Sequence, residues 1–160
     1  MASLNVLSCN VRGMSSVARR DIVVPVLSKW NVVFVQESYI CNQRKAESFE
    51  RAWGNGKCYW SFGKERAAGV GILLSESVDL NVLDVRRDTE GRVMCLLVKW
   101  GGVRYSLLCV YAPVDVRERK SFFRDLYGYV YSNSFVVLGG DFNCVLNVRD
   151  TTARSGVVRS

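Results

Sequence analysis

Short apolar runs alternate with turn residues along the whole chain, and their periodicity predicts a sheet-rich fold. Two-residue alternation over residues 4–11 predicts a first strand with Val6, Ser8 and Asn10 on one face. The apolar run at residues 31–36 predicts a buried second strand that ends at Glu37. Further strands are expected at residues 58–62, 69–74, 78–85, 92–100, 103–111 and 135–138.

A first helix is predicted between the first two strands. Ser15 or Ser16 caps its start, and it extends towards Trp30, while Pro25 predicts a kink or a later start. The apolar residues at helical spacing, which form its expected packing face, are Ile22, Val23, Val26, Leu27 and Trp30.

Two more helices complete the pattern. One is expected at residues 42–53, with Gly54 ending it, and the other begins at Asp115 and Glu118, which resemble a capping box. The residues expected to be buried are Ala46, Phe49 and Trp53 in the former, and Phe122, Phe123, Leu126 and Val130 in the latter. Strands with flanking helices predict a layered α/β or α+β domain spanning residues 1–160.

The composition supports a globular domain without a membrane segment. Of the 160 residues, 49% are apolar, which is enough to build a core. The apolar runs are far shorter than the roughly 20 residues that a membrane span needs. The N-terminus lacks a charged leader followed by an apolar block, so no secretory signal is expected. After Leu146 the chain is rich in Thr, Arg, Ser and Gly, which predicts a loop.

Cysteine and histidine usage removes several kinds of chemistry. The six cysteines are scattered without a CxxC pair, so buried free thiols are expected, with Cys41 and Cys58 as candidate exceptions. The sequence contains no histidine, which excludes Ser-His-Asp, Cys-His and HExxH sites within these residues. Carboxylate, amide and phenol groups remain, and these favour a hard divalent cation.

The net charge of +7 fits a polyanionic partner such as nucleic acid. The cations occur in pairs and short bursts, however, and a solvated surface explains that distribution equally well. Charge alone therefore leaves both interpretations open.

Polar residues stand where predicted strands end. Glu37 and Asp141 each follow an apolar run, and Asn143 lies two residues after Asp141. Asn10 and Tyr111 also end apolar runs. Because ligand sites gather where strands open into loops, these five side chains predict a hydrophilic pocket. Each residue taken singly is equally consistent with an ordinary turn or packing role.

Five motifs in order resemble the endonuclease/exonuclease/phosphatase superfamily. They are LSCNVRG at 7–13, FVQES at 34–38, AGVGIL at 68–73, VYAP at 110–113 and GDFN at 140–143. The sequence around the first and last motifs, together with residues 147–150, is most similar to the apurinic-type endonuclease domain of non-LTR (LINE-type) retrotransposons. The resemblance covers essentially the whole chain.

This resemblance implies a site for in-line hydrolysis of DNA phosphodiesters. Glu37 would be the principal ligand of Mg²⁺, with Mn²⁺ as an alternative, and Asn10 would help to hold the metal or the phosphate. Asp141 would orient and deprotonate the attacking water. Asn143 would stabilise charge on the phosphate oxygens. Tyr111 would donate to the developing oxyanion or act through nearby solvent.

The family pattern continues beyond GDFN with further strands, an aspartate element and a closing Asp-His pair, none of which occurs in these residues. The resemblance therefore implies the N-terminal portion of a DNase I-like sandwich, C-terminally incomplete, with mainly one mixed sheet and flanking helices. We expect impaired activity, and an uncovered apolar sheet face through which the chain self-associates.

Two other functions stay open. One is a nucleic-acid-binding remnant without catalysis, and the other is a phosphatase acting on small phosphate esters. DNA is the expected partner and no membrane is involved. By analogy we expect the protein to act in the nucleus, although the sequence has no long Lys/Arg run that resembles a nuclear localisation signal.

Overall fold

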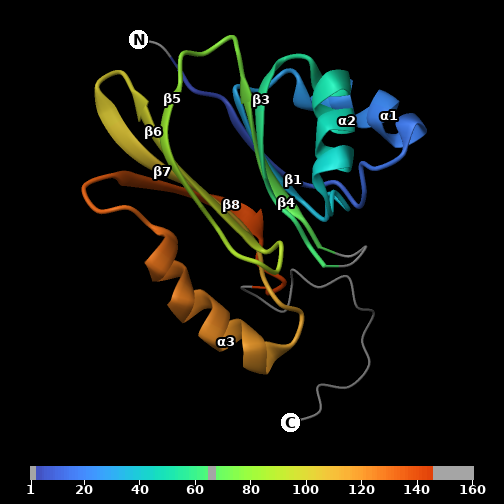
Figure 1. Cartoon of the computed structure of the whole chain (residues 1–160). Helices are drawn as coiled ribbons and strands as arrows, with labels where there is room; N and C mark the ends of the chain where they lie inside the picture. The colour runs from blue at the N-terminus through green and yellow to red at the C-terminus, as the bar shows by residue number, and fades with distance from the viewer. Residues whose placement is uncertain (1–2, 65–67, 146–160) are drawn as a thin grey trace.

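Two four-stranded sheets lie face to face in the computed structural model, which describes residues 3–64 and 68–145 (Figure 1). Sheet A has the order β1 (Val6–Asn10), β2 (Val32–Gln36), β4 (Val70–Ser75), β3 (Gly56–Ser61). Sheet B has the order β5 (Asn81–Arg87), β6 (Val93–Trp100), β7 (Val103–Tyr111), β8 (Phe135–Asp141). The layered sandwich is confirmed, whereas the expectation of mainly one mixed sheet is wrong. Periodicity shows which residues share a strand face, but not which sheet the strand joins.

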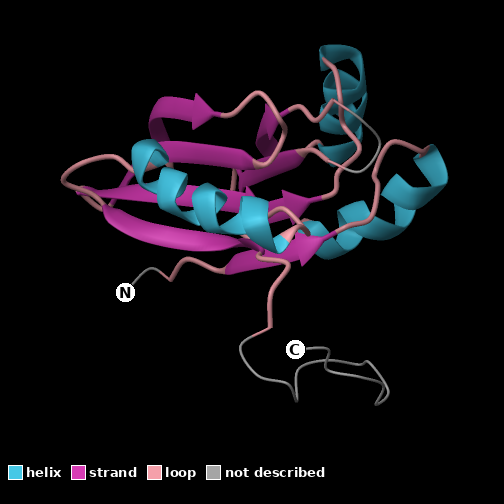
Figure 2. Ribbon diagram, turned by 90° about the horizontal axis from the view of Figure 1, so that it is seen from below, coloured by secondary structure: helices cyan, strands magenta, loops and turns pink. Residues whose placement is uncertain are grey.

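The helices lie outside the strand layers (Figure 2). On the outer side of sheet A are α1 (Val17–Leu27) and α2 (Gln43–Trp53), and sheet B is flanked by α3 (Val116–Asp125) and the 3₁₀ turn η1 (Leu126–Tyr129). Across the described residues, none of these helices has the length and apolar character needed to cross a membrane.

The central core lies between the two sheets. Its fully buried members include Val32, Phe34, Ile72, Leu96 and Leu107. β2 and β4 are buried at every position, because sheet B covers one of their faces and the helices cover the other. Most neighbouring strands are antiparallel, but β1 pairs with β2 and β7 pairs with β8 in parallel. Each sheet therefore contains one pair of strands that end at the same edge.

Helix α1 follows the predicted N-cap and part of the predicted packing face. The Ser16 hydroxyl accepts from the Arg19 amide at 3.3 Å, and Pro25 lies inside the helix, so the later start is wrong. Ile22 and Val26 are 66% and 53% exposed. Val23, Leu27 and Trp30 pack on the core as expected, and Val24 joins them.

The other helices match the predicted positions more closely. Ala46, Phe49 and Trp53 are buried, and Gly54 ends α2 in the left-handed conformation. Asp115 caps α3 through its carboxylate. Of the residues expected to be buried there, Leu126 is buried in η1, Phe122 and Val130 are partly buried, and Phe123 is 37% exposed, contrary to expectation.

Several smaller expectations change in the structure. The strand predicted at residues 78–85 is β5, shifted to Asn81–Arg87. All six cysteines are free, but only Cys95 and Cys109 are buried, and Cys144 is exposed. The loop predicted after Leu146 and the motif-like residues 147–150 lie outside the described residues.

Strand β8 exposes apolar side chains at the margin of sheet B. Phe135, Val136 and Leu138 are 68%, 50% and 47% exposed. Because β8 is the last strand in the order, one of its edges has no neighbouring strand within the described part of the chain. The expected uncovered sheet face is wrong, because the two sheets cover each other; the exposed apolar residues lie on this edge strand instead.

Candidate active site

The candidate site forms where the two parallel strand pairs end. In sheet A, Asn10 at the end of β1 lies opposite Gln36 at the end of β2. In sheet B, Tyr111 at the end of β7 lies opposite Asp141 at the end of β8. A hydrogen bond between Asn10 and Asp141 joins the two edges. The carboxyl ends of four strands therefore meet at one place, which is a common position for ligand sites in layered sheets.

Asn10 bridges the two carboxylates of the site. Its Nδ2 donates to Glu37 Oε1 at 2.8 Å and to Asp141 Oδ2 at 2.9 Å. Its Oδ1 accepts from the Arg12 amide at 3.2 Å, which supports this orientation of the side chain. Both amide hydrogens are thus used to hold two acids close together, so Asn10 organises the acid pair.

Glu37 stands on a left-handed residue directly after a buried strand. Its φ is +51°, a conformation that costs energy for a residue with a side chain. Two backbone bonds hold the segment: Gly13 N donates to Glu37 O at 2.7 Å, and Ser38 N donates to Gly69 O at 2.9 Å. The carboxylate is therefore positioned by a turn that neighbouring loops restrain on both sides.

Asp141 reaches the site because two glycines precede it. A Cβ on Gly139 would lie 2.4 Å from the Phe34 ring, and a Cβ on Gly140 would lie 2.1 Å from the Val110 carbonyl oxygen. These contacts leave no room for a side chain. The Ala112 amide donates to Asp141 O at 2.8 Å and fixes the strand end.

Asn143 lies beside Asp141, with its side chain bonded to the protein. Its φ is +46°, its backbone N donates to Asp141 Oδ1 at 3.0 Å, and its Nδ2 donates to Ala112 O at 2.6 Å. In this arrangement Asn143 orients the Asp141 carboxylate. Its predicted contact with phosphate stays a prediction.

Tyr111 is buried among these groups. Burial raises the pKa of its phenol above the ordinary value, and the neighbouring Glu37 carboxylate raises it further, while Asn143 acts in the opposite direction. The phenol is therefore protonated near neutral pH and can donate a hydrogen bond within the site.

Sequence reasoning missed two residues that support the site. Gln36 is buried, and its Nε2 lies 3.3 Å from the Ser8 hydroxyl and 3.4 Å from Cys109 Sγ. The signal for it was a lone amide inside an apolar run. Arg92 Nη1 donates to Tyr111 O at 3.3 Å, and its guanidinium lies 5.3 Å from the Tyr111 ring centre. No residue pattern around Arg92 in the sequence indicates that it contacts Tyr111.

The donor set suits a small hard cation. Within residues 3–64 and 68–145, no group of three or more His, Cys, Asp and Glu side chains is arranged for a metal. Mg²⁺ does not need such a cage, since it commonly binds one or two carboxylates and fills its other positions with waters and phosphate oxygens. Glu37 and Asp141, bridged by Asn10, fit that mode of binding.

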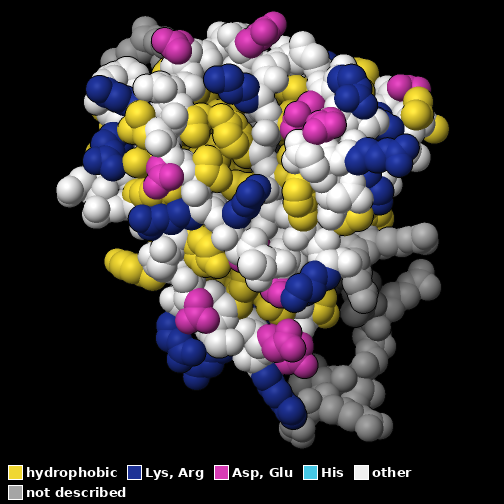
Figure 3. Space-filling view, in the orientation of Figure 1, with side chains coloured by type: hydrophobic (Ala, Val, Ile, Leu, Met, Phe, Trp, Pro, Cys, Tyr) yellow, Lys and Arg dark blue, Asp and Glu magenta, His cyan; other side chains and the backbone are white. Residues whose placement is uncertain are grey.

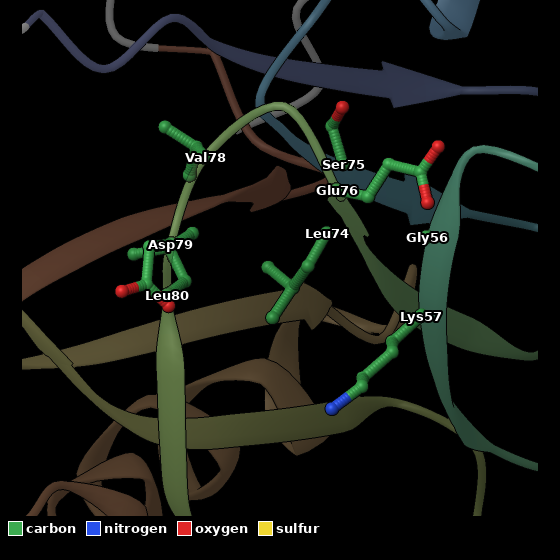
Figure 4. Close-up of a pocket in the computed structure, with 8 residues that line it drawn as sticks. All are labelled: Gly56, Lys57, Leu74, Ser75, Glu76, Val78, Asp79 and Leu80. Atoms are coloured by element: carbon green, nitrogen blue, oxygen red, sulfur yellow. The ribbon is translucent and has the colours of Figure 1, made fainter.

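A second cavity, of about 370 Å³, lies at the opposite end of sheet A, where β4 ends and β3 begins (Figure 4). Lys57, Glu76 and Asp79 stand around it together with apolar residues. Its mixed charges form no pair or cluster with an evident ligand. Glu76 and Asp79 lie far from the candidate active site, so substitutions there are suitable controls.

Comparison with known proteins gives a consistent picture. The family model described as Endonuclease/Exonuclease/phosphatase matches residues 2–155. A Xenopus laevis protein, the Transposon TX1 uncharacterized 149 kDa protein, is 31% identical over 153 residues, which are 92% of this chain and 12% of that protein. The predicted resemblance to this family and to transposon proteins is confirmed.

Solved structures show the same fold at low sequence identity. TDP2 of D. rerio, complexed with a single-strand DNA product, matches with a TM-score of 0.67 and 19% identity over 89% of this chain and 61% of its own. An AP endonuclease from Archaeoglobus fulgidus matches with a TM-score of 0.65 and 24% identity over 94% of this chain and 62% of its own. The chain thus spans less than two thirds of these structures and a small part of the transposon protein. The expected DNase I-like fold is confirmed.

Proposed function

The chain belongs to the endonuclease/exonuclease/phosphatase family, and on that premise we propose that it forms part of a metal-dependent endonuclease domain acting on DNA. The observation that carries the proposal is the Asn10 amide held between the Glu37 and Asp141 carboxylates. The transposon relative and the DNA-bound TDP2 structure support DNA as the substrate. We treat residues 1–160 as one unit of that domain, because the site draws side chains from both sheets.

The residues divide the work of phosphodiester hydrolysis. Glu37 would hold Mg²⁺, or alternatively Mn²⁺, with Asn10 nearby, and the bound ion would neutralise charge on the phosphoryl group. Asp141 would take a proton from the water that attacks phosphorus, while the bond from phosphorus to the leaving oxygen breaks. Tyr111 and Asn143 would donate to the phosphate oxygens as charge develops. For that contact the Asn143 amide would exchange its bond to Ala112 O for one to substrate.

The second candidate function is DNA binding without hydrolysis. The 160 residues carry a net charge of +7 and no histidine, whereas the family resemblance implies a histidine at the scissile phosphate. We therefore propose that these residues alone hydrolyse DNA slowly at best. Binding of DNA through exposed Lys and Arg side chains would persist without the missing group.

A supercoiled-plasmid nicking assay with Mg²⁺ tests the proposal. Wild type is compared with Glu37→Gln and Asp141→Asn, which keep side-chain size while removing charge. Glu76→Gln, at the remote cavity, is the matched control. Thermal unfolding of each variant shows that it is folded. A parallel assay with a small phosphate ester, and its competition against plasmid, separates an endonuclease from a phosphatase.

Nicking by wild type and Glu76→Gln, stopped by EDTA and by either site substitution, would support a metal-dependent endonuclease. Equal and slow nicking by all four proteins would mean a contaminant, and DNA binding would become the leading function. Turnover of the small ester with no effect of plasmid would favour a phosphatase.

Two further expectations accompany this function. The exposed apolar residues of β8 support self-association, which sedimentation velocity would detect and Val136→Lys would weaken. Action on chromosomal DNA, by analogy with the transposon relative, implies a nuclear location that imaging of the tagged chain would test.

A further inference from the structure

The open depression that contains Asp141 and Asn143 is walled on one side by an arginine from α3. Its lining consists of Arg119, Asp141, Asn143, Cys144 and Val145, and its volume is about 600 Å³. The depression therefore contains one of the two acids, Asp141, and extends from it to Arg119 of α3. A substrate bound at Asp141 would extend past the Arg119 side chain.

Arg119 differs from the other charged residues at the start of α3. It is half-buried, whereas Arg117, Glu118 and Lys120 are exposed. Its Nη2 makes a long bond of 3.5 Å to Val114 O. Among residues 3–64 and 68–145, the recorded ion pairs join Lys64 to Glu90 and Arg124 to Asp125, and neither involves Arg119. The guanidinium is thus held at the depression with most of its donors unused by the described residues.

The position of this arginine matters more than the overall charge. Lys and Arg side chains are spread across the face shown in Figure 3 and are interspersed with Asp and Glu, so that face offers no single basic patch. A guanidinium that shares a depression with Asp141 is a specific feature against that background. Its planar fork matches two oxygens of a phosphate, which an ammonium or amide group does not.

We propose that Arg119 binds a non-scissile phosphate of the DNA backbone, next to the phosphate processed at Glu37 and Asp141. This inference rests on the proposed function, because it assigns a binding residue within the same site. Arg119 supplies affinity for a polymeric substrate, and the acid pair supplies the chemistry.

Binding of a short fluorescent DNA duplex, measured by anisotropy in EDTA over a range of salt concentrations, tests Arg119 without cleavage. Arg119→Gln is expected to weaken binding about tenfold, equivalent to about 1.4 kcal/mol. The slope of log affinity against log salt should fall by about one. Arg117→Gln, with the same charge loss on the same helix, should weaken binding less than about twofold if it is a diffuse surface charge. Arg119→Lys should keep the salt slope but lose part of the affinity.

Equal weakening by Arg119→Gln and Arg117→Gln would overturn the inference and leave only diffuse charge, whatever the nicking assay shows. An Arg119-specific loss of binding without nicking would support Arg119 while the hydrolytic function fails. Unmeasurable binding by wild type would overturn both. Retained affinity in Arg119→Lys above that of Arg119→Gln, with equal thermal midpoints, excludes misfolding as the cause.

Discussion

Strands β2 and β8 each carry one carboxylate to the candidate site, but the molecule supports them in opposite ways. β2 lies inside sheet A between β1 and β4 and is buried at all five positions. β8 lies at the margin of sheet B, and its first residues are largely exposed. The strand that leads to Glu37 is therefore fixed by packing on both faces. Asp141 depends on local features: two glycines, a bond to Ala112 and the Asn10 bridge.

The largest effect is expected when one aromatic side chain is removed from each strand. Phe34→Ala empties the space between the sheets and should lower the free energy of unfolding by about 4 kcal/mol. Phe135 is 68% exposed, with a Tyr105 ring at 6.0 Å, so Phe135→Ala should cost less than about 1 kcal/mol. Urea unfolding measures both. Comparable losses would mean that β8 is supported as firmly as β2.

The second prediction tests whether β8 requires glycine at position 140. At Gly140, whose φ is +154°, an added Cβ meets backbone rather than a flexible side chain, so Gly140→Ala should cost about 3 kcal/mol. Gly128→Ala is the control, because nothing lies within 4 Å of its Cβ position, and its effect should stay within about 0.5 kcal/mol. If Gly140→Ala is as harmless as the control, Asp141 does not depend on this close approach.

A metal ion bound at the acid pair would link the end of β2 to the end of β8 and should stabilise the folded protein. Mg²⁺ at ten times its Kd is expected to stabilise wild type by about 1.4 kcal/mol. The shift should vanish in Glu37→Gln and persist in Glu76→Gln, which lies at the remote cavity. Thermal unfolding with Mg²⁺ or EDTA measures it. An equal shift in both variants would place the ion elsewhere.

The smallest expected effect concerns Tyr111, which lies opposite Asp141 and near Glu37. Its folded pKa is raised above the ordinary 10.0, so the unfolded chain releases this proton first as pH rises. The stability from the protonated phenol is complete below that ordinary value and is lost as pH rises through the folded pKa. Tyr111→Phe should therefore lose less stability than wild type in alkaline urea titrations. Parallel curves for the two proteins would contradict this.

The sequence predicted the positions of Glu37 and Asp141 at strand ends better than the arrangement of the sheets. Glu37 and Asp141 end apolar runs, so their places at strand ends follow from local alternation alone. Pairing between strands is not local: β8 joins β7 across the whole of α3, and no periodicity specifies it. The second sheet was missed for that reason. The unequal burial of β2 and β8 follows from the same non-local pairing.

The supporting arginines were missed for a related reason. Arg92 contacts Tyr111 from the turn before β6, and Arg119 enters the depression from α3. In sequence both resemble the other surface cations. Their positions depend on where a turn and a helix pack after the sheets have formed.

The hydrogen bond between Asn10 and Asp141 joins residues 131 positions apart, so the acid pair is complete only after β8 has joined the fold. Such distant contacts carry a large loop-closure cost, and parallel strand pairs add to it, which slows folding. During synthesis, β1 and β2 leave the ribosome long before β8 exists. Until β8 docks, the inner surface beside Gly139 stays open to water and to other nascent chains. The paired acids are thus a marker of completed folding, and slow-folding molecules should aggregate before they acquire the site.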